Sequence, residues 1–253
     1  MSIKTDLAKE IIDRNFPEYS KKKTFFRGKT KITRILIDEE DAKLLKKPSG
    51  RYVTIEADSP RMLYGKFDEE AEAIAAELKE LLPKSGDIIA VGFGNALLTA
   101  DSLGVFASEK IIRHGREKRK IMVLAPGTES KTEMEPKRLA LAAVKEFSPD
   151  AAILVDSLAA EDIKSICRTV QITNSGIAPG SGISERAAVN RDFLKIPTVA
   201  IGSPTVAKLS DGGFVSPKDI DVLVKRTALL IAAGISLAVF PELGIDFIKE
   251  NLM

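Results

Sequence analysis

The stretch at residues 88–104, IIAVGFGNALLTADSLG, decides how this chain folds. Its first four residues are apolar and indicate a buried strand, and the glycine-containing GFGN at 92–95 follows where the chain must leave a sheet. Asp101 therefore comes just past the end of a predicted strand. In open parallel α/β sheets the functional site forms outside the carboxyl ends of the strands, so a carboxylate at this place is a candidate site residue.

A second aspartate, Asp156, takes an equivalent place, because it follows the apolar run AAILV at 151–155. Asp101 also has a structural alternative, the N-cap of the helix predicted for SLGVFASEKII. If the two carboxylates approach each other, repulsion raises the proton affinity of one of them. The pair then offers an ionised carboxylate to activate water and a protonated carboxyl to protonate a leaving group. Such a pair can hydrolyse an amide bond without a metal or a histidine.

Strands and helices alternate through most of the chain, which predicts the α/β class with a mostly parallel sheet and helices on both faces. Further strands are expected at 121–125, 169–173 and 198–202, and helices at about 67–82, 102–114, 135–147, 160–167 and 218–239. Polar–apolar alternation at 30–37 and 51–56 predicts edge or antiparallel strands.

A single domain accounts for most of the 253 residues. The first 23 residues carry a short helical pattern at Leu7, Ile11 and Ile12, which Pro17 ends. We therefore expect an N-terminal leader or arm at 1–23 and one α/β domain at 24–253.

Composition narrows the class of protein. With 44% hydrophobic and 29% charged residues and a net charge of +2, the chain is typical of soluble globular proteins and has no global field to attract nucleic acid. No apolar run approaches transmembrane length, and the charged start lacks the pattern of a signal peptide. The single cysteine, Cys167, cannot form an internal disulfide, which agrees with a reducing compartment. We expect a cytoplasmic protein that binds neither membranes nor nucleic acid directly.

Several other kinds of site are disfavoured. His114 is the only histidine, so a nucleophilic triad or a zinc site lacks ligands. A magnesium site stays open as an alternative, since Asp101 and Asp156 with Glu161 or Asp162 are hard oxygen donors. The pair Gly92 and Gly94 lacks the third glycine of a dinucleotide fingerprint. The glycine-rich loop at 176–182 is either an anion-binding loop or a tight excursion of the backbone.

At these residues the chain resembles the germination protease of endospore-forming bacteria, an aspartic endopeptidase family. The matching segments are VGFGNALLTADSLG, LAPG, ILVDSLAA, VQITNSGIAPGSG, IPTVAIGSPTV and VSPKDIDVLVKRTALLIAAGISLAV, in family order. The resemblance implies a phosphorylase/hydrolase-like α/β fold of the hydrogenase-maturation-protease type. It also implies cleavage of small acid-soluble spore proteins in the forespore or spore core, a homotetramer, and no cofactor or metal.

Carried over by position, the family's catalytic aspartates fall on Asp101 and Asp156, with Gly94 and Asn95 shaping the loop that presents Asp101. Gly180, Ser181 and Gly182 would line the substrate cleft. Family members also mature by cutting their own N-terminus at an acidic residue followed by a hydrophobic residue, alanine, any residue and glutamate. Residues 6–10, DLAKE, fit this pattern, so we expect autoprocessing between Asp6 and Leu7 and a propeptide of about residues 1–6.

The chain departs from the family in two ways. Asn174 and Ala178 stand where members usually carry aspartate and histidine, and the short segment 206–216 replaces a long insertion. Two other functions stay open. One is a hydrogenase-maturation-type endopeptidase, which the scarcity of histidine disfavours, and the other is a non-catalytic sporulation protein that binds peptides or anions at the 176–182 loop.

Overall fold

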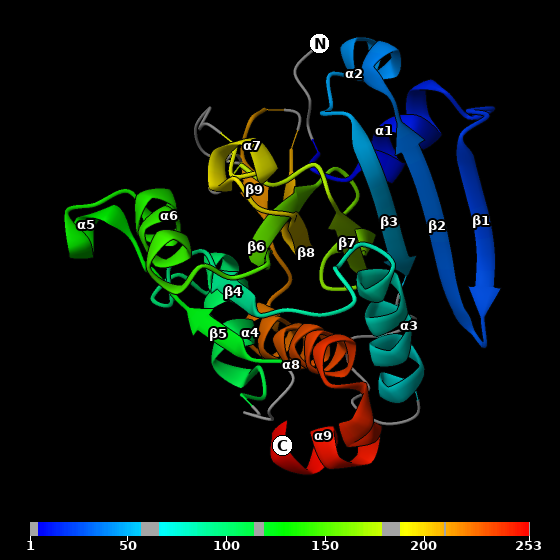
Figure 1. The fold of residues 1–253 in the computed structure, drawn as a ribbon. Helices are drawn as coiled ribbons and strands as arrows, with labels where there is room; N and C mark the ends of the chain where they lie inside the picture. Colours follow the sequence, from blue (N-terminus) through cyan, green and yellow to red (C-terminus); the bar gives the residue numbers. More distant parts are fainter. Residues whose placement is uncertain (1–4, 57–65, 114–118, 179–187, 210, 253) are drawn as a thin grey trace.

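A nine-stranded sheet forms the centre of the computed structural model, which describes residues 5–56, 66–113, 119–178, 188–209 and 211–252 (Figure 1). The strand order is β1-β2-β3-β7-β8-β6-β4-β5, with β9 paired to β8. The strands are β1 (Lys22–Arg27), β2 (Thr30–Ile37), β3 (Gly50–Glu56), β4 (Ile88–Gly92), β5 (Ile121–Leu124), β6 (Ala151–Ala160), β7 (Thr169–Thr173), β8 (Thr198–Lys208) and β9 (Phe214–Val215).

The sheet is mixed. The neighbours β8, β6, β4 and β5 run parallel, whereas β1, β2, β3, β7 and β8 pair antiparallel. The α/β class and the antiparallel placement of β2 and β3 are confirmed. The parallel part is smaller than expected because β7 pairs antiparallel with β8, and the only helix described between them is the four-residue α7 (Arg191–Leu194).

Helices cover both faces of the sheet, as predicted. Side chains of β4 alternate, so Ile88 and Ala90 pack with α3, α4, α8 and α9, whereas Ile89 and Val91 pack with α6 and α7. The helices are α1 (Ala8–Asn15), α2 (Glu39–Leu45), α3 (Phe67–Lys79), α4 (Leu103–Lys110), α5 (Glu129–Thr132), α6 (Pro136–Phe147), α7, α8 (Ile220–Val239) and α9 (Gly244–Leu252).

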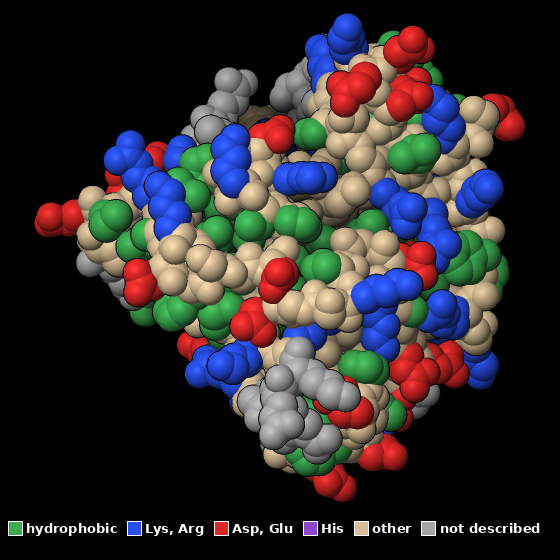
Figure 2. All heavy atoms as spheres, in the orientation of Figure 1, with side chains coloured by type: hydrophobic (Ala, Val, Ile, Leu, Met, Phe, Trp, Pro, Cys, Tyr) green, Lys and Arg blue, Asp and Glu red, His purple; other side chains and the backbone are tan. Residues whose placement is uncertain are grey.

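Helix α8 is the one helix in the described part of the chain that is long and apolar enough to cross a membrane. The sequence analysis did not expect a run of this length. Here α8 packs against α3 and α4 within the large core cluster, and 78% of its most apolar window is buried (Figure 1). Its apolar composition is therefore that of a core helix. Figure 2 shows acidic and basic side chains interspersed over the face viewed there, as the small net charge leads one to expect.

Strand β6 is twice as long as predicted, and the helix expected at 160–167 does not form. The ladder to β8 continues past a register shift after Leu158 as far as Ala160 paired with Ala207. Only a 3-10 turn at Ile163–Ser165 follows, where the side chain of Asp162 accepts a hydrogen bond from the backbone N–H of Lys164. Pairing with a long neighbouring strand outweighs the local helical tendency of the alanine-rich segment. Asp156 therefore lies inside β6 and not after its end.

The expected N-terminal arm packs onto the main body. Ala8, Ile11 and Ile12 of α1 pack with side chains of β2 and β3, and Leu7 packs with Leu158 and Ala160 of β6. The polar strand β1, which the sequence analysis missed, then forms the outer edge of the sheet. The boundary at residue 23 and the propeptide remain predictions.

Candidate active site

Asp156 is a buried carboxyl in the middle of the sheet. Its neighbour in the β8 register is Gly202, and Gly202 in turn pairs with Gln171 of β7, so the three residues form one row across β6, β8 and β7. Asp156 is only 3% exposed, and its Oδ1 accepts a hydrogen bond from the N–H of Ser157 at 2.9 Å. Burial raises the pKa of Asp156 well above its usual range, and the charge of Asp101 raises it further. Both effects favour the protonated form of Asp156.

Asp101 is presented by the loop that follows β4. It ends a 3-10 turn at Thr99–Asp101, and the N-cap residue of α4 is Ser102, so Asp101 does not cap that helix. The backbone of Asp101 accepts a hydrogen bond from the N–H of Asn95 at 2.9 Å. Gly94 has φ +120°, and a Cβ there would lie 1.9 Å from the carbonyl oxygen of Asp101. A glycine is required for this close approach, so Gly94 and Asn95 set the position of Asp101.

The charge of Asp101 acts on the carboxyl of Asp156, whereas the joint catalytic role of the two aspartates stays a prediction. The loop is also tied to the sheet, because the hydroxyl of Thr205 in β8 donates to the carbonyl oxygen of Ala100. Asp101 is not among the described residues that line the cavity beside Asp156.

That cavity has a volume of about 370 Å³ and is formed mainly by residues of β6, β7 and β8, by the segment before β3 and by the segment after β7. Asp156, Gln171 and Lys47 line it, and so do Thr5 and Asp6 from the N-terminal segment. The predicted autoprocessing site therefore lies in the same cavity as one of the two predicted catalytic aspartates.

The carbonyl oxygen of Asp6, at the predicted cleavage site, accepts two hydrogen bonds. Lys47 Nζ donates to it at 2.8 Å and Gln171 Nε2 donates at 3.1 Å. On the other side of the Asp6–Leu7 bond, Gln171 Oε1 accepts the N–H of Ala8 at 2.8 Å. One amide side chain thus holds the peptide on both sides of the bond.

Each specified position of the cleavage pattern has its own contact. Asp6 makes two hydrogen bonds to the backbone of Ala159. Its N–H donates to the Ala159 carbonyl oxygen, and its side-chain Oδ2 accepts the Ala159 N–H, each at 2.8 Å. Leu7 is 1% exposed among apolar side chains of β6, and Ala8 is equally buried. The acidic, hydrophobic and alanine positions are therefore all in contact with the body of the protein.

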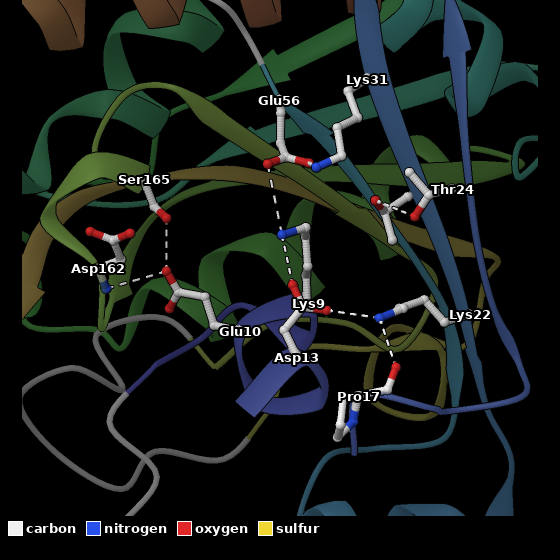
Figure 3. Close-up of polar contacts among 11 residues, drawn as sticks. Lys9, Glu10, Asp13, Pro17, Lys22, Thr24, Lys31, Glu56, Asp162 and Ser165 are labelled. Carbon is white, nitrogen blue, oxygen red and sulfur yellow. Dashed lines mark hydrogen bonds and ion pairs between the residues drawn. The ribbon is translucent and has the colours of Figure 1, made fainter. Parts of the chain in front are cut away.

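Glu10, the last position of the pattern, is held by the turn after β6. Its carboxylate accepts hydrogen bonds from the N–H of Glu161 at 2.8 Å, the N–H of Asp162 at 3.3 Å and Ser165 Oγ at 2.8 Å. In Figure 3 the Glu10 side chain extends toward Asp162 and Ser165, whereas Lys9, at the unspecified position, lies between Glu56 and Asp13. The contacts of Glu10 thus fix the start of α1 against this turn.

Glu161 and Asp162 do not join Asp101 and Asp156 in a ligand set, because their turn binds α1: Glu161 pairs with Arg14 and both backbone N–H groups hold Glu10. The described residues contain no group of three or more His, Cys, Asp and Glu side chains arranged to hold a metal ion. The magnesium alternative therefore has no ligand set in the described part of the chain.

The remaining candidate positions lie near the cavity or outside the described residues. Gly180, Ser181 and Gly182, and also His114, fall outside the described ranges. Asn174 accepts the N–H of Arg51 through its side chain at 2.8 Å, which fixes the start of β3, and Ala178 lines the cavity. The short segment at 206–216 completes β8 and forms β9, and Lys208 from this hairpin also lines the cavity.

Sequence reasoning missed Lys47 and Gln171. The only signal for Gln171 was its large polar amide side chain, which stands within the predicted strand TVQIT among threonine, valine and isoleucine. Lys47 carried no signal, because it follows another lysine in a polar segment between α2 and β3.

Comparison with known proteins gives one consistent family. A profile described as germination protease matches residues 14–211. A germination protease of Caldanaerobacter subterraneus is 31% identical to this chain, and the alignment covers 96% of each of the two proteins. One from Bacillus velezensis is 34% identical over 79% of this chain and 58% of its own length.

A germination protease of Clostridium perfringens is 28% identical over 324 aligned positions, covering 99% of both chains. That alignment is longer than the chain itself, in agreement with the absence of a segment that relatives carry. Among solved structures, the [NiFe] hydrogenase maturation protease HycI of Thermococcus kodakarensis superposes with a TM-score of 0.41 at 18% identity, over 63% of this chain and 98% of its own.

Proposed function

This chain belongs to the germination protease family, and from that premise we propose that it is a spore endopeptidase that uses Asp101 and Asp156 to hydrolyse peptide bonds. The family consists of endopeptidases, so the assignment as an enzyme follows directly. The proposal adds the aspartic mechanism, the substrate and the self-cleavage.

In the proposed reaction Asp156 enters protonated, as its burial favours, and Asp101 enters ionised. Asp101 takes a proton from a water molecule while the water oxygen attacks the carbonyl carbon of the substrate. The tetrahedral intermediate then loses its amine, which takes the proton of Asp156. A proton returns from Asp101 to Asp156 to restore the starting state.

The proposed substrates are small acid-soluble spore proteins in the spore core, and the proposed assembly is a homotetramer. The first substrate is the chain itself, cut between Asp6 and Leu7. A single observation carries the proposal: Asp6, which stands before the bond expected from the family's cleavage pattern, lines the same cavity as Asp156.

The test uses the purified full chain, incubated at mildly acidic pH with and without a small acid-soluble protein. Mass spectrometry should detect a new N-terminus at Leu7 and discrete fragments of the substrate. Asp101→Asn and Asp156→Asn should each remove both activities, whereas Asp192→Asn, on the exposed helix α7, should retain them. Cleavage by Asp156→Asn at the normal rate would refute the mechanism, and a folded chain that cleaves nothing would favour the non-catalytic alternative.

A further inference from the structure

We propose that Lys47 and Gln171 are catalytic residues that together bind the carbonyl oxygen of the residue before the cleaved bond and stabilise the charge that develops on it. This inference rests on the proposed cleavage after Asp6. It adds two residues from outside the aspartate pair to the reaction.

The first support is the pair of donors on one oxygen. The N–H of Asp6 bonds to the backbone of β6, but its carbonyl oxygen is held by two side chains, Lys47 Nζ at 2.8 Å and Gln171 Nε2 at 3.1 Å. An oxyanion-binding site needs donors about 2.7–3.1 Å from the place that the charged oxygen will take, and these two donors already hold the carbonyl oxygen from which it forms.

The second support is that the Gln171 amide has a defined orientation. Its Oε1 accepts the N–H of Ala8, which only the oxygen of the amide can do, and its Nε2 must therefore point to the Asp6 carbonyl. Gln171 holds the peptide on both sides of the Asp6–Leu7 bond and so fixes the bond in the cavity.

The third support is the position of these donors relative to Asp156. Gln171 and Asp156 stand in one row across the sheet, with Gly202 between them. A Cβ at Gly202 would lie 2.4 Å from the backbone oxygen of Asp156, so no side chain fits between the two. Gln171 and Lys47 thus bind the carbonyl oxygen beside the row that contains Asp156, and on the opposite side of the peptide the Leu7 N–H donates to Thr5 Oγ1 at 3.0 Å.

Charge favours the same role. Burial lowers the pKa of Lys47, and the nearby Asp6 carboxylate partly opposes this change. A positive charge removed from bulk water interacts strongly with a negative charge that forms beside it. The ammonium of Lys47 therefore stabilises an oxyanion more than it stabilises the neutral carbonyl.

In the reaction, attack by water moves the π electrons of the Asp6 carbonyl onto its oxygen, where Lys47 and Gln171 bind the resulting negative charge. When the carbonyl re-forms, the bond between the Asp6 carbon and the Leu7 nitrogen breaks, and that nitrogen takes a proton from Asp156. The products are a carboxylic acid at Asp6 and a free amine at Leu7, and the two donors keep their own protons.

The test measures the first-order rate at which the Leu7 N-terminus appears in the full-length chain. Lys47→Met removes one donor and its charge, and Gln171→Glu removes the Nε2 donor while keeping an acceptor for Ala8. Each should slow cleavage by about 100-fold, the usual effect of losing one oxyanion donor. Lys47→Arg should recover part of the rate. Lys43→Met, at an exposed position of α2 that does not line the cavity, should cleave within about twofold of the original chain.

Hydrogen exchange of residues 5–12 separates catalysis from docking. The proposal expects the slow variants to keep the protection of this segment, so that only the chemical step is impaired. Normal cleavage by Lys47→Met and Gln171→Glu, or loss of protection in step with loss of rate, overturns the proposal. If one variant fails to fold, the other decides.

The results that would refute the proposed function differ from those that would refute only the role of Lys47 and Gln171. An original chain that never cuts before Leu7, or an Asp156→Asn chain that still does, refutes the proposed function itself. An original chain that cuts, with an inactive Asp156→Asn and fully active Lys47→Met and Gln171→Glu variants, refutes only the role of the two donors.

Discussion

Asp156 should make the stability of the folded protein depend on pH. Its pKa rises on folding above the ordinary 3.8, so the unfolded chain holds fewer protons than the folded chain between those two pKa values. Stability therefore falls as pH rises through this window, and each pKa unit of difference is worth about 1.4 kcal/mol. Asp156→Asn removes the effect, so it should be the more stable protein at pH 7.

Urea unfolding of both proteins between pH 4 and pH 8 measures this difference. The gap between Asp156→Asn and the original chain should widen with rising pH and then level off. Asp192→Asn serves as the control for a surface carboxylate. Parallel stability curves for Asp156→Asn and the original chain would mean that folding leaves the pKa of Asp156 unchanged.

The sequence could single out Asp101 and Asp156 as candidates because each residue follows an apolar run that forms a strand, and β4 and β6, which contain these runs, are parallel neighbours in the sheet. Lys47 and Gln171 could not be predicted in the same way. Lys47 lies in the polar segment before β3 and Gln171 lies inside β7. Only the antiparallel pairing of β7 with β8 brings Gln171 into the row that contains Asp156, and the pairing of β3 with β7 brings the segment of Lys47 to the same cavity.

At the scale of elements, Glu10 anchors helix α1 to the turn after β6. A carboxylate that accepts hydrogen bonds from two backbone N–H groups and one hydroxyl contributes more than neutral bonds do, about 1.5–3 kcal/mol for such a charged group. Glu10→Ala should therefore lower the free energy of unfolding by about that amount and release the segment that contains Asp6 and Leu7.

Chemical denaturation and limited proteolysis of residues 5–15 test the anchor. Glu18→Ala, at an exposed position just beyond the same helix, is the matched control and should change stability by less than about 0.5 kcal/mol. Unchanged protection of α1 in Glu10→Ala would show that its apolar residues hold the helix without this carboxylate.

The type of a segment, helix or strand, could be predicted where one hydrophobic periodicity dominated its sequence. The prediction failed where pairing with a neighbouring strand decided the type. The amphipathic helix at 67–82 formed nearly as expected, as α3, because its apolar face matches the helical repeat. The segment after Asp156 has the composition of a helix but pairs with β8 as a strand, and the polar strand β1 owes its existence to pairing with β2. Such long-range pairing is not encoded in a local pattern.

At the scale of the whole molecule, the predicted cleavage site already lies in the cavity of the same chain. Self-cleavage should therefore be intramolecular, with a first-order rate constant that does not change when the protein is diluted about 100-fold, since no encounter between molecules is needed. Mass spectrometry of samples matured at several concentrations gives this rate. A rate constant that falls in proportion to concentration would mean that one molecule cuts another.

The burial of Leu7, Ala8, Ile11 and Ile12 has a consequence for the enzyme after it has matured. After the proposed cut before Leu7, these four apolar side chains would stay packed on β2, β3 and β6, so the new N-terminus would remain next to the cavity. A substrate protein must therefore first displace the segment that begins at Leu7. Newly matured enzyme should accordingly show a delay before steady turnover, governed by how often helix α1 lifts away from the sheet.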